Sequence, residues 1–508
     1  MYKKLLLISM LSICWGCSNI NTSPSVQLDE LTIPEIHTAY QEGTYTAEEL
    51  VRAYIERIEN NDSLITAISV INEDAIQQAQ ALDQEFEETG VLRPLHGIPM
   101  LVKDNFNTKS LPTTAGSLAL DGFIPESNAT MVQQLIDAGA IIIAKTNMAE
   151  WAFSPMHSHS STIGFTRNPY NTDHVPAGSS GGTGAAIAAN FGVIGLGTDT
   201  GNSIRGPSSH NALVGYRSTL GLTSRYGVIP LYLRNDVAGP MMRTVHDATL
   251  VLNQIAGFDP KDPVTIYSKG KVEEDYTQFL KEDGLEGARI GVLRALSDSN
   301  TDPEIQALFE QALQDMKDSG AEIIDPFVIP SFDEVRRNQW CAMFKNDVEL
   351  YLQEFVKDSS MQTIEDIIAV GTESDFAASR LQSSANANVQ TSTEGVCSDP
   401  FTDKRRIAYR SAIESEMDRF NVDAIVYPSW NHKPALIDSF RVQYRGDNSQ
   451  VIAPHTGQPA FTVPMGFTSG NLPAGLQILG RMFDEATLIE ISYAYEQKTK
   501  HRKAPSLN

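Results

Sequence analysis

The sequence predicts a single-domain α/β protein, built on a large mixed, mostly parallel β-sheet that is covered by helices on both faces. Two observations lead to this prediction. The chain has 508 residues, of which 41% are hydrophobic and 20% charged, a globular composition with enough apolar side chains for a large core. Short apolar runs also alternate with amphipathic helical patterns, and such alternation is typical of parallel strands joined by crossover helices.

The first helix with a clear start follows Thr46. The segment Thr46-Ala47-Glu48-Glu49 is a capping box, in which the side chains of Thr46 and Glu49 satisfy backbone N–H groups at the start of a helix. Apolar residues then recur with helical spacing on one face: Leu50, Val51, Tyr54, Ile55 and Ile58. We expect further helices at residues 73–87 and 130–138.

Apolar runs that predict buried strands occupy residues 98–102, 140–144, 192–196, 288–293 and 424–427. Residues 267–406 differ from the rest of the chain, because acidic helical patterns and segments rich in Ser, Thr and Asn dominate there. We predict that this region is variable and largely helical, and that it covers the sheet without forming a domain of its own.

The N-terminus predicts export. Lys3 and Lys4 precede a short apolar stretch at residues 5–13, a pattern typical of an export signal and too short to span a bilayer as a helix. Gly16 before Cys17, followed by polar residues, resembles a bacterial lipoprotein processing site at which Cys17 becomes the lipidated first residue.

We therefore expect an export signal at residues 1–17, a polar tether at 18–30 and the folded domain at 31–508. The expected location is the periplasm or cell envelope, with plain secretion and a retained anchor as the alternatives. After processing, Cys341 and Cys397 would remain, either as a disulfide or as two separate buried thiols.

The charge balance and the cysteine spacing exclude several functions. A formal net charge of −24 repels nucleic-acid phosphates and anionic lipids, so we expect no nucleic-acid partner and membrane contact only through a lipid anchor. The four cysteines are scattered and match no metal-site signature, so no metal site is expected.

Two segments rich in Ser and Gly stand out, AGSSGGTGAA at residues 177–186 and GLGTDTGNSIRGP at 195–207. A phosphate-binding loop is a weak interpretation, because neither usual glycine motif fits. A Ser-His-Asp hydrolase is also weak: Ser180 sits in a formal Gly-x-Ser-x-Gly match, but no apolar strand precedes it and no histidine has a triad context. The third interpretation is a nucleophilic serine with a lysine base.

These two segments resemble the signature of the amidase-signature family, which includes fatty-acid amide hydrolases, peptide amidases and the glutamine-hydrolysing subunit of tRNA-dependent amidotransferases. Four further segments match motifs of the family: GIPMLVKDNF at 97–106, AKTNMAEW at 144–151, GQPAFTVP at 457–464 and LPAGLQ at 472–477. The resemblance covers nearly all of residues 30–500, is weakest across 267–406, and implies the amidase-signature fold.

The resemblance also implies roles for individual residues. Lys103 matches the family's catalytic lysine, Ser179 the proton-relaying serine that follows a cis peptide bond, and Ser203 the nucleophile that forms the acyl-enzyme. The expected oxyanion hole consists of backbone N–H groups of Thr200, Gly201, Asn202 and Ser203. Ser180 matches a supporting serine of the same network, with a simple turn residue as the alternative.

Physical chemistry supports a site of this kind. A serine hydroxyl is a poor nucleophile unless a neighbouring base accepts its proton. Lysine can be that base only when it is neutral, and burial lowers its pKa. Lys103 follows an apolar run, as a desolvated position requires, although a surface lysine or an ion pair with Asp104 is the alternative. Asp199 and Arg205 are expected to hold the turn and not to take part in the chemistry.

The implied reaction is hydrolysis of a small-molecule or peptide amide through an acyl-enzyme, with release of ammonia or a small amine and no cofactor. The alternatives are a glutamine-hydrolysing amidotransferase subunit, which the export signal argues against, and a catalytically inactive binding protein. Many family members have Gly where this chain has Asn202, and a side chain there can narrow the acyl pocket. His210 is either a hydrogen-bonded structural histidine or a substrate contact, and Trp151 and Phe153 either line the acyl pocket or belong to the core.

Overall fold

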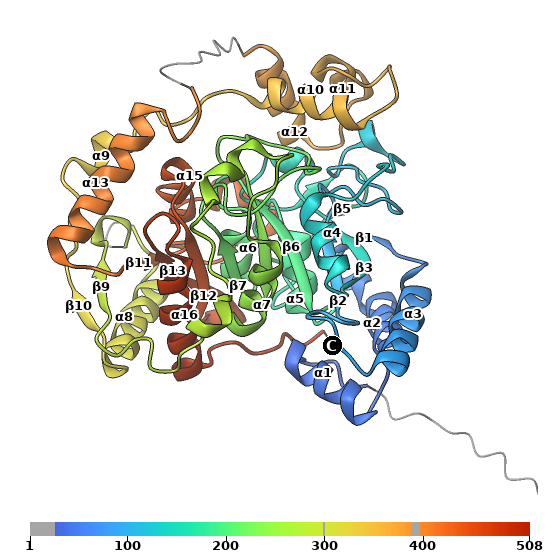
Figure 1. The fold of residues 1–508 in the computed structure, drawn as a ribbon. Coiled ribbons are helices and arrows are strands. Elements are labelled where there is room, and N and C mark those ends of the chain that lie inside the picture. The colour runs from blue at the N-terminus through green and yellow to red at the C-terminus, as the bar shows by residue number, and fades with distance from the viewer. Residues whose placement is uncertain (1–25, 298–299, 388–396, 508) are drawn as a thin grey trace, which may run out of the picture.

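The computed structural model describes residues 26–297, 300–387 and 397–507 (Figure 1). The predicted export signal with Cys17 and the first part of the predicted tether lie outside these residues. The rest of the tether packs on the domain, because Leu28 is buried and Glu30 forms an ion pair with Arg502.

The strands of the main sheet are β1 (Ile68–Ile71), β2 (Pro99–Lys103), β3 (Ile141–Thr146), β6 (Ile194–Asp199), β7 (Val214–Arg217), β8 (Val237–Met242), β9 (Arg289–Val292), β10 (Glu322–Ile324), β11 (Ala424–Pro428), β12 (Ala460–Thr468) and β13 (Leu472–Leu479). Their order across the eleven-stranded sheet is β1-β3-β2-β6-β8-β7-β12-β13-β11-β9-β10. β4 (His159–Ser160) and β5 (Gly164–Phe165) form a separate two-stranded sheet.

The longer helices are α1 (Ile33–Glu42), α2 (Ala47–Asn61), α3 (Ala75–Thr89), α4 (Thr130–Asp137), α5 (Gly181–Ala188), α6 (Arg205–His210), α7 (Val245–Ile255), α8 (Pro303–Asp318), α10 (Phe344–Phe355), α11 (Ile364–Val370), α12 (Asp375–Ala385), α13 (Lys404–Phe420) and α16 (Glu485–Thr499). Single-turn helices complete the set: α9 (Phe332–Val335), α14 (Phe440–Gln443) and α15 (Ala453–Thr456). The capping box at Thr46 is present, with reciprocal bonds between Thr46 and Glu49, and the predicted helices at 73–87 and 130–138 correspond to α3 and α4.

The large mixed α/β sheet is confirmed, but the expected predominance of parallel pairing is wrong. Parallel pairs lie toward the two ends of the sheet, where β2 joins β3 and β6, and where β9 joins β10 and β11. Six of the ten neighbouring pairs in the described sheet are antiparallel. The connection of β12 to β13 shows why: only Ser469–Asn471 separates them, too few residues for a crossover helix.

Helices cover both faces of the sheet, as predicted, and strand β7 shows how. A Cβ atom at Gly215 would collide with Ser208 of α6, so this residue faces α6. The next residue, Tyr216, places its hydroxyl 3.3 Å from Thr249 Oγ1 of α7. Because neighbouring residues of a strand point to opposite faces, α6 and α7 lie on opposite sides of the sheet.

Residues 267–406 are largely helical but also complete the sheet. The region contains β9 and β10, and β10 is an edge strand. Helices α10, α11 and α12 form a cap at one end of the sheet (Figure 1). The cap packs its apolar residues, such as Phe344 and Leu381, against Trp151 and Phe153. Among the described residues, none of the helices combines the length and the apolar composition that a membrane span needs.

Candidate active site

The ends of two neighbouring parallel strands position the predicted catalytic residues. Val102 of β2 pairs with Leu196 of β6, so Lys103 at the end of β2 lies beside the last residues of β6. After β6 the chain turns through residues 200–204 and enters α6. Residues 179–180 precede α5, which packs on both strands. The predicted residues therefore converge at the carboxyl end of β2 and β6, the edge where ligands of open α/β sheets bind.

Lys103 is fully buried and hydrogen-bonds to hydroxyl groups. Its Nζ lies 2.7 Å from Ser179 Oγ and 2.8 Å from Thr198 Oγ1. Burial lowers the pKa of Lys103 to about 7, although Asp236 and Asp199 oppose this shift. The alternative ion pair with Asp104 is not formed, because the Asp104 carboxylate lies 3.3 Å from the Nζ of Lys145. A large fraction of Lys103 is therefore neutral at neutral pH.

Ser179 follows a cis peptide bond from Gly178, as the resemblance implied. A Cβ atom at position 178 would collide with the carbonyl oxygens of His157 and Ser154, so this close approach requires glycine. The carbonyl oxygen of Ser179 accepts hydrogen bonds from Ala149 N at 3.0 Å and from Ser158 Oγ at 3.2 Å. The Ser179 hydroxyl is thus held in a rigid turn beside Lys103.

Ser180 connects this turn to strand β6. Its hydroxyl donates to the carbonyl oxygen of Thr198 at 3.2 Å and accepts from the Thr198 N–H at 3.3 Å. Thr198 is also the residue whose hydroxyl binds Lys103. Ser180 therefore fixes the position of a group that contacts the lysine.

Ser203 lies in the turn after β6 and is only 4% exposed. Its hydroxyl is 3.4 Å from Oδ1 of Asn202, to which it donates. Among the described residues, no hydrogen bond joins the hydroxyls of Ser203 and Ser179. The structure thus links Lys103 directly to Ser179, while Ser203 is turned toward the Asn202 side chain. Asn202 also donates from Nδ2 to the carbonyl oxygen of Pro155 at 3.3 Å.

A buried charge cluster holds the turn that carries Ser203. The Asp199 carboxylate lies 3.0 Å from Nε of Arg205 and 2.9 Å from Nη1 of Arg217, and all three side chains are fully buried. The same carboxylate accepts from the backbone N–H of Ile204 at 3.2 Å, and Arg205 donates to the carbonyl oxygen of Gly201 at 2.8 Å. Burial alone would raise the pKa of Asp199, but the two guanidinium groups hold it at about 2. These contacts give Asp199 and Arg205 the structural position that we expected.

A cavity of about 510 Å³ opens onto the turn. Thr200, Gly201, Asn202 and Ser203 line its floor. Much of its wall is apolar or aromatic: Phe153, Leu231, Tyr232, Trp340, Met343 and Phe344. Phe153 thus lines the cavity, whereas Trp151 lies in the core beneath the cap and is 1% exposed.

His210 fits neither of its two predicted roles. It is 2% exposed, its ring lies 4.5 Å from the Trp430 ring, and it does not line the cavity. Neither ring nitrogen has a hydrogen-bond partner among the residues that the structure describes. Burial lowers the pKa of His210 to about 3, so the ring is a neutral packing group at the end of α6.

Two further residues of the site, Thr198 and Asn105, were not predicted from the sequence. Asn105 Nδ2 donates to Thr198 Oγ1 at 3.1 Å, and this hydroxyl also binds Lys103. Both residues stand inside segments that match motifs of the family, two positions after Lys103 and one before Asp199. Their position in these motifs could have marked them as site residues. Only their contacts show that Asn105 binds Thr198 and that Thr198 binds Lys103.

The comparisons with known proteins agree with the fold. A probable amidase of Arabidopsis thaliana is 34% identical, over 96% of this chain and 94% of that protein. One of the subunits of glutamyl-tRNA(Gln) amidotransferase from Caldanaerobacter subterraneus is 31% identical, over 94% of this chain and 99% of that protein. The crystal structure of native peptide amidase from Stenotrophomonas maltophilia matches with a TM-score of 0.82 and 34% identity, over 94% and 99% of the two chains.

The fold and these similarities define a hydrolase that acts on C–N amide bonds. The family model named Amidase matches residues 49–489. The chain belongs to this family, the amidase-signature enzymes.

The charge cluster generates a stability prediction for Asp199→Asn. This change leaves two buried guanidinium groups without their carboxylate, and removing one partner of a buried ion pair costs about 3–5 kcal/mol. Urea denaturation should therefore show a much lower free energy of unfolding. The matched control is Glu85→Gln, whose ion pair with Arg93 is only partly buried at the surface and should contribute about 1 kcal/mol or less. Equal effects of the two substitutions would contradict the role given to the cluster.

Proposed function

We propose that this protein is an exported amidase that hydrolyses a peptide amide or an N-acyl amide, with Ser203 as nucleophile, Ser179 as proton relay and Lys103 as base. The observation that carries the proposal is the 2.7 Å contact between Lys103 Nζ and Ser179 Oγ in a fully buried setting. A lysine can accept a proton only when its amine is neutral, and the lowered pKa of Lys103 provides that form near pH 7.

The first half of the proposed reaction forms the acyl-enzyme. The Ser203 hydroxyl leaves Asn202, turns toward Ser179 and attacks the amide carbonyl carbon. Its proton passes to Ser179, whose own proton passes to the neutral Lys103. Negative charge develops on the carbonyl oxygen, which the backbone N–H groups of residues 200–203 stabilise, each such donor contributing about 2.7–4 kcal/mol. The relay then returns a proton to the leaving nitrogen, the C–N bond breaks, and ammonia or an amine departs.

The second half releases the acid. A water molecule attacks the acyl carbon and gives its proton to the same relay. The bond to Ser203 breaks, Ser203 recovers its proton, and a carboxylic acid leaves the cavity. Each proton taken up by Lys103 is returned within the cycle, so the proposed reaction consumes only the amide and water.

The cavity favours an amide with a sizeable acyl part. About 510 Å³ bordered by aromatic and apolar side chains is more than a primary amide group alone occupies. Such a lining gains from burying an apolar or aromatic acyl group. An amidotransferase subunit would instead bind glutamine in the cytoplasm together with a partner protein. The predicted export signal and this cavity both favour the amidase over that alternative.

Two features support the proposed export as a lipoprotein. The Gly16-Cys17 site follows a charged and then apolar N-terminal segment. Cys341 and Cys397, which the sequence allowed either to pair or to remain free, form a disulfide. Disulfides persist in oxidising compartments such as the periplasm and are rare in the cytosol.

Ser203 should be the reactive serine. Intact-mass measurement after treatment with a fluorophosphonate should show a single adduct on the wild-type protein and none on Ser203→Ala. Ser208→Ala is the matched control, because the Ser208 hydroxyl has no hydrogen-bond partner among the described residues and does not line the cavity, and it should keep the adduct. A wild-type protein that forms no adduct between pH 7 and 9 would favour the inactive binding protein instead.

The pH dependence should follow Lys103. Because its pKa lies at about 7, below the ordinary value, the neutral base is depleted under acidic conditions and predominates above neutrality. The value of kcat/KM should therefore rise about tenfold per pH unit below pH 7 and level off above it. Burial also raises the pKa of Asp447 to about 7, and this carboxylate bonds to Gln450 at the cavity. If Lys103 causes the rise of kcat/KM with pH, the variant Asp447→Asn should show the same rise. A kcat/KM that does not change with pH in this variant would show that Asp447 is the titrating group.

Lipidation should depend on Cys17 alone. In a bacterial host fed labelled palmitate, the wild-type protein should carry the label and sediment with membranes. Cys17→Ser should lose both properties, whereas Cys14→Ser, the matched control three residues earlier, should keep them. A membrane-bound but unlabelled wild-type protein would indicate a retained anchor, and an unlabelled soluble one would indicate plain secretion.

A further inference from the structure

One wall of the cavity consists of a segment without regular secondary structure. Residues 340–344 all line the cavity; residues 340–343 belong to the connection between α9 and α10, and Phe344 begins α10. Residues 339–343 belong to no helix or strand. Because no strand ladder fixes this wall, its position relative to Ser203 depends on side-chain contacts.

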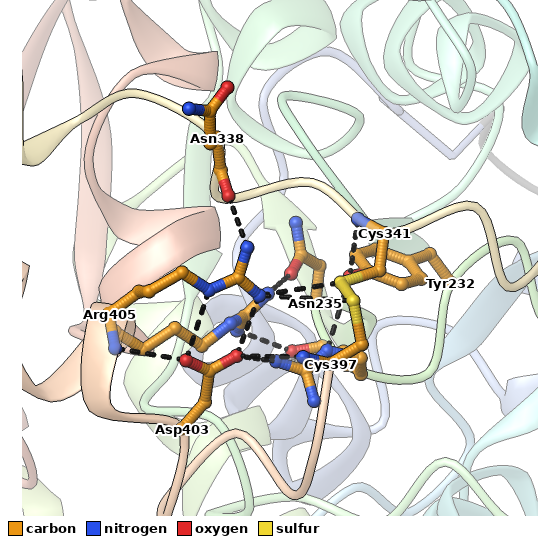
Figure 2. The surroundings of a disulfide bond; sticks show 9 residues. Tyr232, Asn235, Asn338, Cys341, Cys397, Asp403 and Arg405 are labelled. Carbon is orange, nitrogen blue, oxygen red and sulfur yellow. Dashed lines mark hydrogen bonds and ion pairs between the residues drawn. A yellow bond between two sulfur atoms is a disulfide. The ribbon is translucent and has the colours of Figure 1, made fainter. Parts of the chain in front are cut away.

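Three contacts near Cys341 supply that support, and Figure 2 shows two of them, the disulfide and the hydrogen bond to Tyr232. The disulfide joins Cys341 to Cys397, 56 positions later in the chain and shortly before α13. The backbone N–H of Cys341 donates to the Tyr232 hydroxyl at 3.0 Å, and the Trp340 ring lies 4.5 Å from the Tyr232 ring. Tyr232 is itself buried and lines the cavity. The disulfide is thus the covalent part of a wall that substrate would touch.

The disulfide lies against a guanidinium group. Arg405 Nη2 is 3.5 Å from Cys341 Sγ and 3.9 Å from Cys397 Sγ (Figure 2). Asp403 pairs with both Arg405 and Arg234 at 2.8 Å, so these three side chains carry one net positive charge. A cation beside a sulfur stabilises a thiolate, which makes Cys341 a good leaving group in thiol–disulfide exchange.

We propose that the Cys341–Cys397 disulfide is a specificity-determining element, which holds residues 340–344 in place and thereby sets the affinity for bulky acyl groups. The inference rests on the proposed function. Breaking the bond releases the wall from the segment at Cys397. The reacting groups should be spared, because Lys103 and Ser179 are held by the sheet and Ser203 by the Asp199 cluster.

Dithiothreitol is a suitable probe of the bond. Its thiolate attacks the sulfur of Cys397, the more exposed of the two cysteines, and the S–S bond breaks with Cys341 leaving as a thiolate. The second thiol of dithiothreitol then displaces Cys397. Two electrons pass to the protein, Cys341 and Cys397 become thiols, and dithiothreitol becomes a cyclic disulfide.

The experiment compares the oxidised and reduced full-length enzyme on two substrates, an aromatic N-acyl amino-acid amide and acetamide. Reduction should raise KM for the aromatic substrate about tenfold, the scale of a lost apolar pocket contact. It should leave kcat within about twofold and leave acetamide hydrolysis unchanged. The rate of fluorophosphonate labelling should also stay the same, because this probe is small and reports on Ser203 itself.

The variant Cys341→Ser/Cys397→Ser is the internal control. Without dithiothreitol it should already have the raised KM of the reduced enzyme, and dithiothreitol should no longer change it. The inference is overturned if reduction leaves KM unchanged, if it lowers kcat and labelling for both substrates alike, or if the variant still responds to the reductant. Absence of labelling in the oxidised wild type would instead contradict the proposed function. Because the wild-type measurements need no substitution, the test stands even if the variant does not fold.

Discussion

The amine of Lys103, buried at the end of strand β2, determines which groups can surround it. A charged lysine is expensive to bury without a counter-ion, so a lysine that contacts only hydroxyl groups favours its neutral form. Lys145, one strand away, is equally buried, but its amine lies 3.3 Å from Asp104. Burial lowers the pKa of both lysines, that of Lys103 to about 7 and that of Lys145 to about 8. The partners differ: the contacts of Lys103 are hydroxyl groups, as the proposed base requires, whereas Lys145 has a carboxylate as counter-ion.

The second constraint is the Asp199 carboxylate. It pairs with two guanidinium groups and also accepts hydrogen bonds from backbone N–H groups after the turn. Asp199 ends β6, and its side chain folds back onto the N–H groups at the start of α6. Arg205 extends this arrangement by donating to the carbonyl oxygen of Gly201. Burying three charges is costly, and their mutual pairing offsets that cost only in this geometry. The turn is therefore held by ion pairs and hydrogen bonds that converge on Asp199.

The groups proposed to react and much of the cavity wall belong to different parts of the chain. The ends of β2 and β6 hold the groups proposed to react, whereas the cap helices and residues 340–344 form much of the cavity wall. The cap belongs to residues 267–406, where the family resemblance is weakest. The proposed role of the disulfide fits the same division, since it stabilises a wall that the sheet does not reach.

The sequence by itself determined the elements and motifs that depend on near neighbours. The capping box at Thr46 and the apolar runs that became β2, β3, β6, β9 and β11 are local signals, because helix starts and buried strands are set by residues a few positions apart. The motifs that contain Lys103, Ser179 and Ser203 were visible for the same reason. β12 was missed because Pro464 and Gly466 interrupt its apolar pattern at a bulge. Only the tertiary structure decided the antiparallel centre of the sheet, the pairing of Asp104 with Lys145, the disulfide and the turn of the Ser203 hydroxyl toward Asn202. These features depend on contacts between distant segments and on side-chain rotamers. Both are determined only when the whole core packs.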